Sequence, residues 1–352
     1  MNPPTCDVFK LLLFTALLPI IAGCAISASP GRPMAYVTIP LGQPGVQDRR
    51  GDFQLEFCKL LAEDKGSPAC GDYLNDVIPE FPVAGIKMEN YDASKFVLLW
   101  LPGIFSECVA GLGKPFDDVI GGVSDRLRYP SYYVPLPGRA SSRYNAEIIA
   151  KAIDAHVPAD KRAILIGYSK GGVDALEMLG ADFTANSKVA ALITVASPLH
   201  GTPLADELGA FYENTFGKID TDVCPRHDGG EMRSLTVAER RAWWLSHHVP
   251  SNIPVYSIAA VPHAGEVSPM LQVLWRKLSL IDPNNDGQVA ATDAFAPHGY
   301  VLGYVRADHW AVAINFSKST PIGGALLFKD NFPRLTLYLA ALNVVLRDLE
   351  KR

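Results

Sequence analysis

The stretch Ala163-Ile164-Leu165-Ile166-Gly167-Tyr168-Ser169-Lys170-Gly171 decides how the whole chain is interpreted. It opens with apolar residues, typical of a strand buried on both faces of a sheet, and residues 171–179 after it predict a helix. A turn this tight needs small residues two positions before and two after Ser169, and both positions hold glycine. Because such a turn strains the serine backbone and points the hydroxyl outward, we interpret Ser169 as a candidate nucleophile. The alternative is a simple N-cap of the helix.

Apolar runs of strand length alternate with stretches of helical pattern along most of the chain. The predicted strands cover residues 96–101, 132–136, 163–166, 190–195, 254–259 and 300–305. The predicted helices cover residues 145–155, 171–179, 270–280 and 335–349. This alternation predicts an α/β fold in which helices cover both faces of a doubly wound, mostly parallel sheet.

Length and charge narrow the class of protein. The chain has 352 residues, of which 48% are hydrophobic, enough to bury a large core. No linker-like composition marks a boundary between residues 36 and 352, so we expect one α/β domain with insertions there. The net charge is −5 and no run of Lys and Arg is interleaved with aromatic residues, so nucleic acid is not an expected partner.

Two further motifs add a resemblance to a known family. Residues 197–202 read Ser-Pro-Leu-His-Gly-Thr after the strand at 190–195, and residues 140–146 read Ala-Ser-Ser-Arg-Tyr-Asn-Ala. Together with the Gly-x-Ser-x-Gly turn, they make residues 95–350 resemble the bacterial lipase and esterase branch of the α/β-hydrolase superfamily. The resemblance implies an α/β-hydrolase fold and a serine hydrolase acting on ester bonds. It does not extend to residues 36–94.

A serine hydroxyl needs an adjacent base to act as a nucleophile, and histidine has the pKa suited to that task. His309 follows the last predicted strand and precedes the final helical region, where the resemblance places the catalytic histidine. His298 precedes the same strand and is expected at the opposite edge of the sheet. His200, after the Ser-Pro step, is the reserve candidate for the base.

The third residue of a triad orients the histidine, and in this family it lies between the serine and the histidine in the chain. Asp286 is the favoured acid because residues 285–289 read Asn-Asp-Gly-Gln-Val, which resembles the family's acid loop. The expected catalytic set is therefore Ser169, His309 and Asp286.

The acid loop also fits the spacing of an EF-hand-type calcium loop. The ligands would be Asp282, Asn284, Asp286 and Asp293. No matching helix follows the loop, and its twelfth position holds Asp rather than Glu, which are departures from that motif. If calcium occupied the loop, either Asp206 or Asp308 would have to serve as the triad acid.

Ester cleavage passes through a tetrahedral oxyanion that two N–H donors stabilise. The backbone N–H of Lys170, directly after the serine, is the first expected donor. The second lies in the loop after the first predicted strand, where the family has His-Gly and an apolar residue and this chain has Pro102-Gly103-Ile104-Phe105. The match points to Ile104, with Phe105 as the alternative because a proline replaces the histidine. A pairing with Asp174, four residues on, explains the Lys170 side chain as well as a contact with a substrate head group does.

About fifty residues, 199–251, interrupt the alternation of strands and helices just after the nucleophile region. An insertion of this length is more than a loop. We expect a helical cap over the active site. The alternative is a structural excursion that covers the sheet.

The N-terminus has the pattern of an export signal. An apolar stretch at residues 11–21 is too short to span a bilayer and leads into Ile21-Ala22-Gly23-Cys24. This ending resembles the lipobox of bacterial lipoproteins, which implies a signal peptide at residues 1–23, lipidation of Cys24 and, because Ala25 follows, an outer-membrane location. Residues 24–35 would form a tether. The alternative is an ordinary signal peptide, which also predicts export.

Four cysteines follow Cys24, an even number that allows all of them to pair: Cys58, Cys70, Cys108 and Cys224. In an oxidising compartment this predicts two disulfides. Loop closure favours the local pair Cys58 with Cys70, which leaves Cys108 with Cys224. Free buried thiols are the alternative for the second pair.

Three function hypotheses follow. The first is a serine carboxylic ester hydrolase for lipid-like acyl esters that works through an acyl-enzyme and needs no cofactor, with calcium at most structural. The second is a thioesterase, amidase or polyester depolymerase with the same triad. The third is a non-catalytic envelope lipoprotein that keeps the fold as a binding module. The expected partners are a lipid or acyl-ester substrate and, through the lipid anchor, the membrane.

Overall fold

The computed structural model describes residues 45–64, 66–75, 95–319, 327–329 and 331–351, which all belong to one unit of the chain, Pro33–Arg352. A second unit, Met1–Arg32, lies outside the described residues. The predictions for the signal peptide, for Cys24 and for the tether at 24–35 therefore fall outside the described residues.

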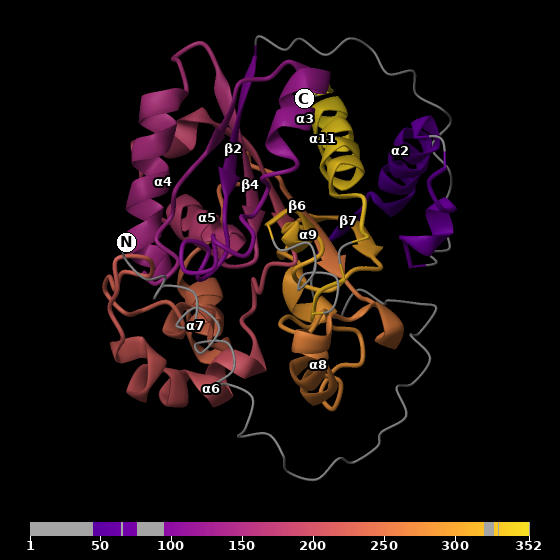
Figure 1. Ribbon diagram of the computed structural model, residues 1–352. Coiled ribbons are helices and arrows are strands. Elements are labelled where there is room, and N and C mark those ends of the chain that lie inside the picture. The colour runs from indigo at the N-terminus through magenta and orange to yellow at the C-terminus, as the bar shows by residue number, and fades with distance from the viewer. Residues whose placement is uncertain (1–44, 65, 76–94, 320–326, 330, 352) are drawn as a thin grey trace, which may run out of the picture. The chain divides into compact units, whose positions relative to one another are not determined.

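The apolar runs of the sequence pair side by side in one sheet, with every neighbouring pair of strands parallel (Figure 1). The order across the sheet is β1-β7-β6-β5-β4-β2-β3. The strands are β1 Gln47–Asp48, β2 Phe96–Leu101, β3 Ser131–Tyr133, β4 Arg162–Tyr168, β5 Val189–Val195, β6 Val255–Ala260 and β7 Tyr300–Val305. The predicted parallel α/β sheet is confirmed.

Strand β2 shows why continuous apolar runs form this sheet. Its side chains alternate between the two faces. Phe96, Leu98 and Trp100 belong to one core cluster, and Val97, Leu99 and Leu101 belong to the other. All of β2 is buried, as expected for a strand covered by helices on both sides. Two hydrophobic cores, one on each face, therefore hold the sheet.

Strand β3 is shorter than the predicted run 132–136. The Val134 N–H still donates to the Trp100 carbonyl at 2.9 Å. Pro135 follows and has no N–H, so the hydrogen-bond ladder stops there.

Helices cover both faces of the sheet (Figure 1). They are α2 Arg50–Glu63, α3 Ile120–Leu127, α4 Ser142–His156, α5 Lys170–Gly180, α6 Pro203–Asn214, α7 Val237–Ser246, α8 Gln272–Leu278, α9 Phe316–Ser319 and α11 Arg334–Glu350. Helices α2, α3 and α11 contribute to one core and α4, α5 and α7 to the other. Within the described ranges, no helix has both the length and the apolar character needed to cross a membrane.

Residues 45–75, which the sequence resemblance did not cover, belong to this domain. Strand β1 pairs with β7, and α2 packs against α11 and β7. The Phe53 ring lies over Gly303, where an added Cβ would come within 2.9 Å of it. A disulfide between Cys58 and Cys70 closes the end of α2 onto the following turn.

The order of the strands reverses beside β2. The chain runs from β2 outward to β3 and then returns to the other side of β2 to form β4. In open α/β sheets, ligands bind outside the carboxyl ends of the strands where the order reverses. The loop after β2 and the turn after β4 therefore lie at the position where a binding site is expected.

The predicted insertion at 199–251 contains helices α6 and α7 joined by irregular segments and short 3₁₀ turns. Its helix α7 contributes Trp243 to the core on the α4 and α5 face. This segment therefore covers part of the sheet as well as extending beyond it.

Candidate active site

The turn after β4 has the predicted strained geometry. Ser169 has φ 52° and ψ −127°, a region that L-residues other than glycine seldom adopt. A Cβ at position 171 would lie 2.3 Å from the carbonyl oxygen of Leu101, so only glycine allows α5 to approach β2 this closely. The glycine requirement fixes Ser169 at the start of α5, beside the loop after β2.

A continuous chain of hydrogen bonds links three buried side chains from three loops. His309 Nε2 lies 2.9 Å from Ser169 Oγ, and His309 Nδ1 lies 2.8 Å from Asp286 Oδ2. A carboxylate only accepts hydrogen bonds, so Nδ1 carries the proton and leaves Nε2 free to accept from the serine hydroxyl. The structure thus brings together the three residues expected to form the catalytic set, in the tautomer that nucleophilic catalysis needs.

Asp286 is held in place by its own loop. Its Oδ1 accepts hydrogen bonds from the backbone N–H groups of Gln288 and Val289 at 2.8 and 2.7 Å. Its carbonyl also accepts from the backbone N–H of His309 at 3.0 Å. Both carboxylate oxygens are therefore engaged, one with the loop and one with the histidine.

The calcium alternative for this loop receives no support from the donor geometry. Asp282 accepts hydrogen bonds from the backbone of Asn284 at 2.8 Å and from the Thr292 hydroxyl at 3.2 Å. Burial, followed by the nearby Asp282 carboxylate, raises the pKa of Asp293 to about 6. Across the described residues, no group of three or more His, Cys, Asp or Glu side chains is arranged to hold a metal ion.

The reserve candidates have other contacts. His200 Nε2 lies 2.9 Å from the Phe295 carbonyl, and its ring stacks on Trp244 with a centroid distance of 5.5 Å. Burial lowers the pKa of His200. Asp206 accepts from the backbone N–H of Val237 at 3.3 Å. His298 immediately precedes the strand that begins at residue 300, at the end of the sheet opposite Ser169.

Asp308 supports the loop that carries the histidine. Its carboxylate accepts hydrogen bonds from the backbone N–H groups of Ser268, Trp310 and Ala311 at 2.7, 3.1 and 2.9 Å. Burial raises its pKa even though these bonds act in the opposite direction. Asp308 thus fixes the loop backbone, whereas Asp286 contacts the imidazole.

Sequence reasoning missed one neighbour of the histidine, Tyr168. Its hydroxyl donates to the His309 carbonyl at 2.9 Å, and the two rings lie 5.3 Å apart. Burial raises the pKa of Tyr168 well above its usual value, so the hydroxyl stays a donor. The only available signal was its place next to Ser169, which does not reveal a contact with a residue so distant in the chain.

The loop after β2 lies against Ser169. A Cβ added at Gly103 would be 3.0 Å from the Ser169 Cβ. The Phe105 N–H donates to the Gly138 carbonyl at 3.4 Å, which favours Ile104 over Phe105 as the free donor in this loop. The other expected donor, the N–H of Lys170, belongs to the first turn of α5 and has no intrahelical acceptor.

The Lys170 side chain is buried in a local ion pair, the first of the two alternatives that the sequence left open. Its Nζ lies 2.6 Å from Asp174 Oδ1, and both side chains are about 1% exposed. Asn145 donates to the other carboxylate oxygen of Asp174 at 2.7 Å. The lysine head group is thus directed at this pair, and only its backbone is left for the site.

A second disulfide joins the insertion to the site. Cys108, shortly after the loop next to Ser169, is bonded to Cys224 of the insertion. The Phe105 ring also lies 5.4 Å from the ring of Tyr212 on α6. Both disulfides follow the pairing that loop closure favours, and the insertion contacts the loop that lies beside Ser169.

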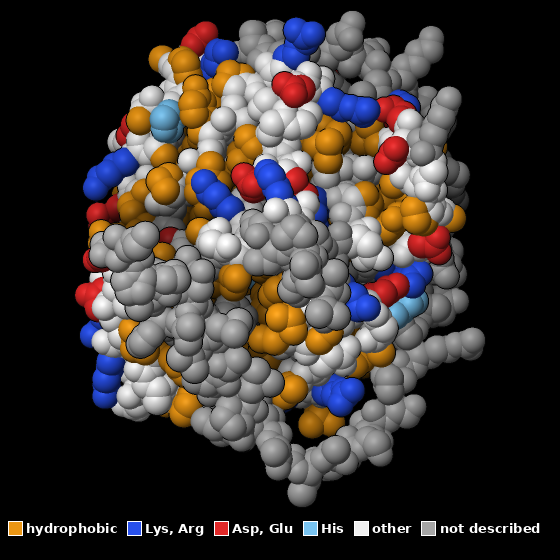
Figure 2. All heavy atoms as spheres, viewed as in Figure 1, with side chains coloured by type: hydrophobic (Ala, Val, Ile, Leu, Met, Phe, Trp, Pro, Cys, Tyr) orange, Lys and Arg blue, Asp and Glu red, His pale blue; other side chains and the backbone are white. Residues whose placement is uncertain are grey.

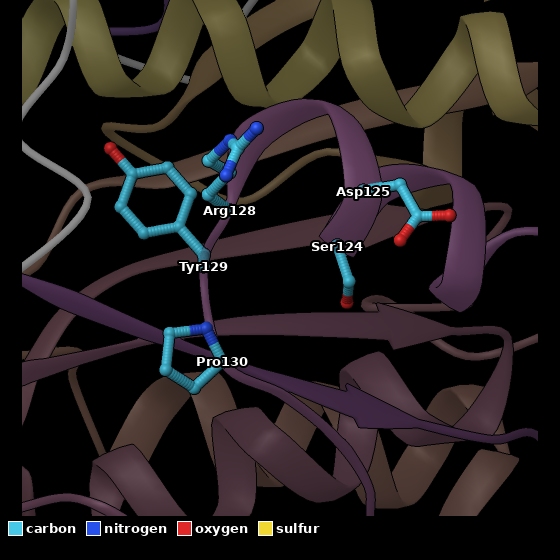
Figure 3. Close-up of a pocket in the computed structure, with 5 residues that line it drawn as sticks. All are labelled: Ser124, Asp125, Arg128, Tyr129 and Pro130. Carbon is cyan, nitrogen blue, oxygen red and sulfur yellow. The ribbon is translucent and has the colours of Figure 1, made fainter.

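A shallow surface pocket lies at the amino end of the strands. Figure 3 shows a shallow pocket lined by Ser124, Asp125, Arg128, Tyr129 and Pro130. These residues directly precede β3, so the pocket lies at the amino end of the strands, away from Ser169.

Exposed large apolar side chains occur on and beside α6 and α8, including Phe211, Ile219, Val273, Leu280 and Ile281. In the lower half of Figure 2, where these helices lie in the same view, hydrophobic side chains show between atoms that are not described.

A doubly wound parallel sheet that presents a strained serine at a strand-to-helix turn defines an α/β-hydrolase. A family model described as a PGAP1-like alpha/beta domain matches residues 141–238. The crystal structure of the metagenomic carboxyl esterase MGS0156 aligns over 91% of this chain and 97% of its own, with 30% identity and a TM-score of 0.82. The chain therefore belongs to the same α/β-hydrolase family as this carboxyl esterase, and the predicted fold class is confirmed.

More distant structures share the fold. The mature lipase BlEst2 from Bacillus licheniformis is 20% identical, with 74% of this chain and 96% of that chain aligned and a TM-score of 0.54. EstA from Clostridium botulinum is 12% identical, with 88% and 98% aligned and a TM-score of 0.50. No curated protein sequence matches the chain.

Proposed function

We propose that this α/β-hydrolase is a serine carboxylic ester hydrolase that cleaves acyl esters through a Ser169-His309-Asp286 triad. The observation that carries the proposal is the hydrogen-bond chain from Asp286 Oδ2 to His309 Nδ1, at 2.8 Å, and from His309 Nε2 to Ser169 Oγ, at 2.9 Å. The chain starts at a carboxylate and ends at a serine in a strained turn, an arrangement suited to a nucleophile and its base.

The reaction follows from this geometry. As Ser169 Oγ attacks the ester carbonyl carbon, His309 Nε2 takes its proton and the carbonyl electron pair moves onto oxygen. The N–H groups of Lys170 and Ile104 stabilise that oxyanion. His309 then returns the proton to the leaving alkoxide, and an acyl-enzyme remains. Water then attacks the acyl carbon while His309 takes one of its protons. The bond between the acyl carbon and Ser169 Oγ breaks, His309 returns the proton to Oγ, and the acid leaves.

Acyl esters are the substrate class that we favour. The relative at 30% identity is described as a carboxyl esterase, and the relatives that share only the fold include a lipase. Exposed apolar side chains on α6 and α8 fit a substrate with an apolar acyl group. The insertion at 199–251 would act as the cap, since its Tyr212 contacts the loop beside the nucleophile.

We also propose that the protein is exported and anchored to the bacterial outer membrane through lipidated Cys24. The two disulfides support an oxidising compartment, because such bonds are rare where thiols are kept reduced. Membrane fractionation of the full-length chain and of Cys24→Ser tests the anchor. Wild type should stay with the outer membrane and the variant should lose fatty-acyl labelling; equal labelling of both would contradict the proposal.

A fluorophosphonate probe tests the catalytic proposal. Wild type should form a stable adduct, Ser169→Ala should form none, and the exposed control Ser187→Ala should label like wild type. If the probe does not label wild type, the catalytic proposal fails, and the hypothesis of a non-catalytic binding module is favoured instead. Hydrolysis rates on matched oxygen ester, thioester and anilide substrates then decide among the hydrolase alternatives, and we expect the oxygen ester to be cleaved fastest.

A further inference from the structure

The loop after β2 is held in an unfavourable conformation right beside Ser169. Phe105 has φ 58°, in the left-handed region that is unfavourable for a residue other than glycine. The buried Ser106 hydroxyl donates to the Gly103 carbonyl at 2.6 Å and tightens the same turn. A strained loop persists only when contacts from outside it fix its shape.

The main outside contact is a clamp between Glu107 and Gly138. The Gly138 N–H donates to both carboxylate oxygens of Glu107 at 2.8 Å, and the Gly138 carbonyl accepts from the Phe105 N–H at 3.4 Å. A Cβ at position 138 would lie 2.4 Å from the Phe105 nitrogen, so no other residue fits there. One glycine thus binds the loop at two points.

The residue next to this glycine ties the clamp to the insertion. The Arg139 guanidinium is buried and donates to the carbonyls of Gly217 at 2.9 Å and Cys224 at 3.0 Å. It also lies 3.7 Å from the Glu231 carboxylate. Since Cys224 is bonded to Cys108, which directly follows Glu107, both sides of the clamp are fastened to one segment.

We propose that Glu107 is a positioning residue that aims the Ile104 N–H at the oxyanion, an inference that rests on the proposed function. The carbonyl oxygen becomes fully charged only in the tetrahedral state, so a misplaced donor weakens that state more than substrate binding. Among the described residues, the Glu107 carboxylate accepts from the Gly138 N–H and not from a residue of the triad. Its removal releases Gly138 and lets Phe105 relax, which moves the neighbouring donor away from the reacting oxygen.

Steady-state kinetics of Glu107→Ala, Glu107→Met and Glu107→Gln on a short p-nitrophenyl ester test the proposal. Glu107→Ala and Glu107→Met lack both acceptors and should lower kcat roughly 10- to 100-fold, with KM changed less than about threefold. Glu107→Gln should lose less, because its amide oxygen still accepts from Gly138. The control Glu63→Ala removes an exposed glutamate that pairs with Arg126 and should match wild type.

A trifluoromethyl ketone separates positioning from general loosening. Ser169 Oγ adds to its carbonyl carbon and creates a stable oxyanion, so its inhibition constant should rise by the same factor as kcat falls. Wild-type kcat in both Glu107→Ala and Glu107→Met would overturn the proposal, as would a fall in kcat with unchanged ketone affinity. If the alanine variant does not fold, the methionine variant, which keeps the bulk, decides. Failure of the proposed function is distinct, because wild type itself would then resist the fluorophosphonate.

Discussion

At the scale of single residues, His309 receives its orientation from several directions. Asp286 accepts from its Nδ1 and from its backbone N–H, and the Tyr168 hydroxyl donates to its carbonyl. The Asp308 carboxylate accepts from the backbone N–H of Trp310, directly after the histidine, and from that of Ser268 in a separate loop. The imidazole is therefore held in one position, so the proposed reaction would need little reorganisation of this residue.

Asp286→Asn should abolish most activity through the tautomer of His309. The amide oxygen would stay at the Oδ1 position, where two backbone N–H groups donate, and the NH₂ group would face His309 Nδ1. That placement forces the proton onto Nε2, which then cannot accept from Ser169. We expect kcat to fall on the order of 10³- to 10⁴-fold with a similar KM. Activity above a tenth of wild type would contradict this role, and the control Asp206→Asn should stay near wild type.

Asp293→Asn should stabilise the protein at neutral pH. The folded-state pKa of about 6 exceeds the usual aspartate pKa of 3.8, so the folded state binds the proton more tightly. The stability cost of Asp293 therefore grows as the pH rises from about 4 and is complete above about pH 6. The variant should gain about 1–2 kcal/mol at pH 7.5 and little at pH 4. Thermal unfolding at both pH values measures the difference.

The same variant also tests the calcium alternative. If Asp293 were a calcium ligand, Asp293→Asn would lose stability at pH 7.5, and EDTA would lower the Tm of wild type but not of the variant. We expect the opposite sign for the mutation and no effect of EDTA on either protein.

At the scale of elements, α2 forms part of the core of the domain. Phe57 on its buried face is fully buried and lies 6.3 Å, ring to ring, from Phe332 just before α11. Arg49, before α2, pairs with Asp348 of α11 at 2.9 Å. These contacts join the first described segment to the last helix.

Phe57→Ala should lower the free energy of unfolding by about 3–5 kcal/mol, because it leaves a cavity between α2 and α11. The matched variant Leu55→Ala alters a side chain on the same helix that is 50% exposed and should change stability by less than about 0.5 kcal/mol. Urea unfolding of both variants provides the comparison. Similar losses in the two would mean that α2 does not pack as described.

The sequence could predict those elements whose local pattern of side chains already indicates whether they are buried or form a tight turn. Strand β2 is apolar at every position, and the turn at Ser169 has glycine on both sides, so each is visible locally. Chain order then indicated which loops reach the same edge of the sheet, and this brought His309 and Asp286 into consideration.

Other contacts could not be predicted from the sequence. Strand β1 is a short edge strand with mixed burial, and its pairing depends on β7 rather than on its own pattern. The bond from Tyr168 to His309 and the clamp between Glu107 and Gly138 join residues far apart in the chain without any motif. Only the packing of the whole domain brings these groups together.

At the scale of the whole molecule, the two disulfides close loops of very different length. Cys58 and Cys70 are 12 residues apart, whereas Cys108 and Cys224 are 116 apart. Loop closure entropy predicts that removing the long-range bond costs about 5 kcal/mol and removing the local one about 3 kcal/mol. Urea unfolding of Cys108→Ser/Cys224→Ser and of Cys58→Ser/Cys70→Ser tests the ranking. The reverse ranking would show that native-state strain, rather than chain entropy, dominates.

The pairing of β1 with β7, and of α2 with α11, also sets the timing of assembly. The chain is synthesised from its N-terminus, so β1 and α2 emerge long before the strand and helix that they contact. The apolar side chains of β1 and α2 therefore stay exposed until β7 and α11 have been synthesised and can pack against them. A nascent chain halted before β7 would thus hold an incomplete sheet without His309, and we expect esterase activity to arise only after synthesis of the domain is complete.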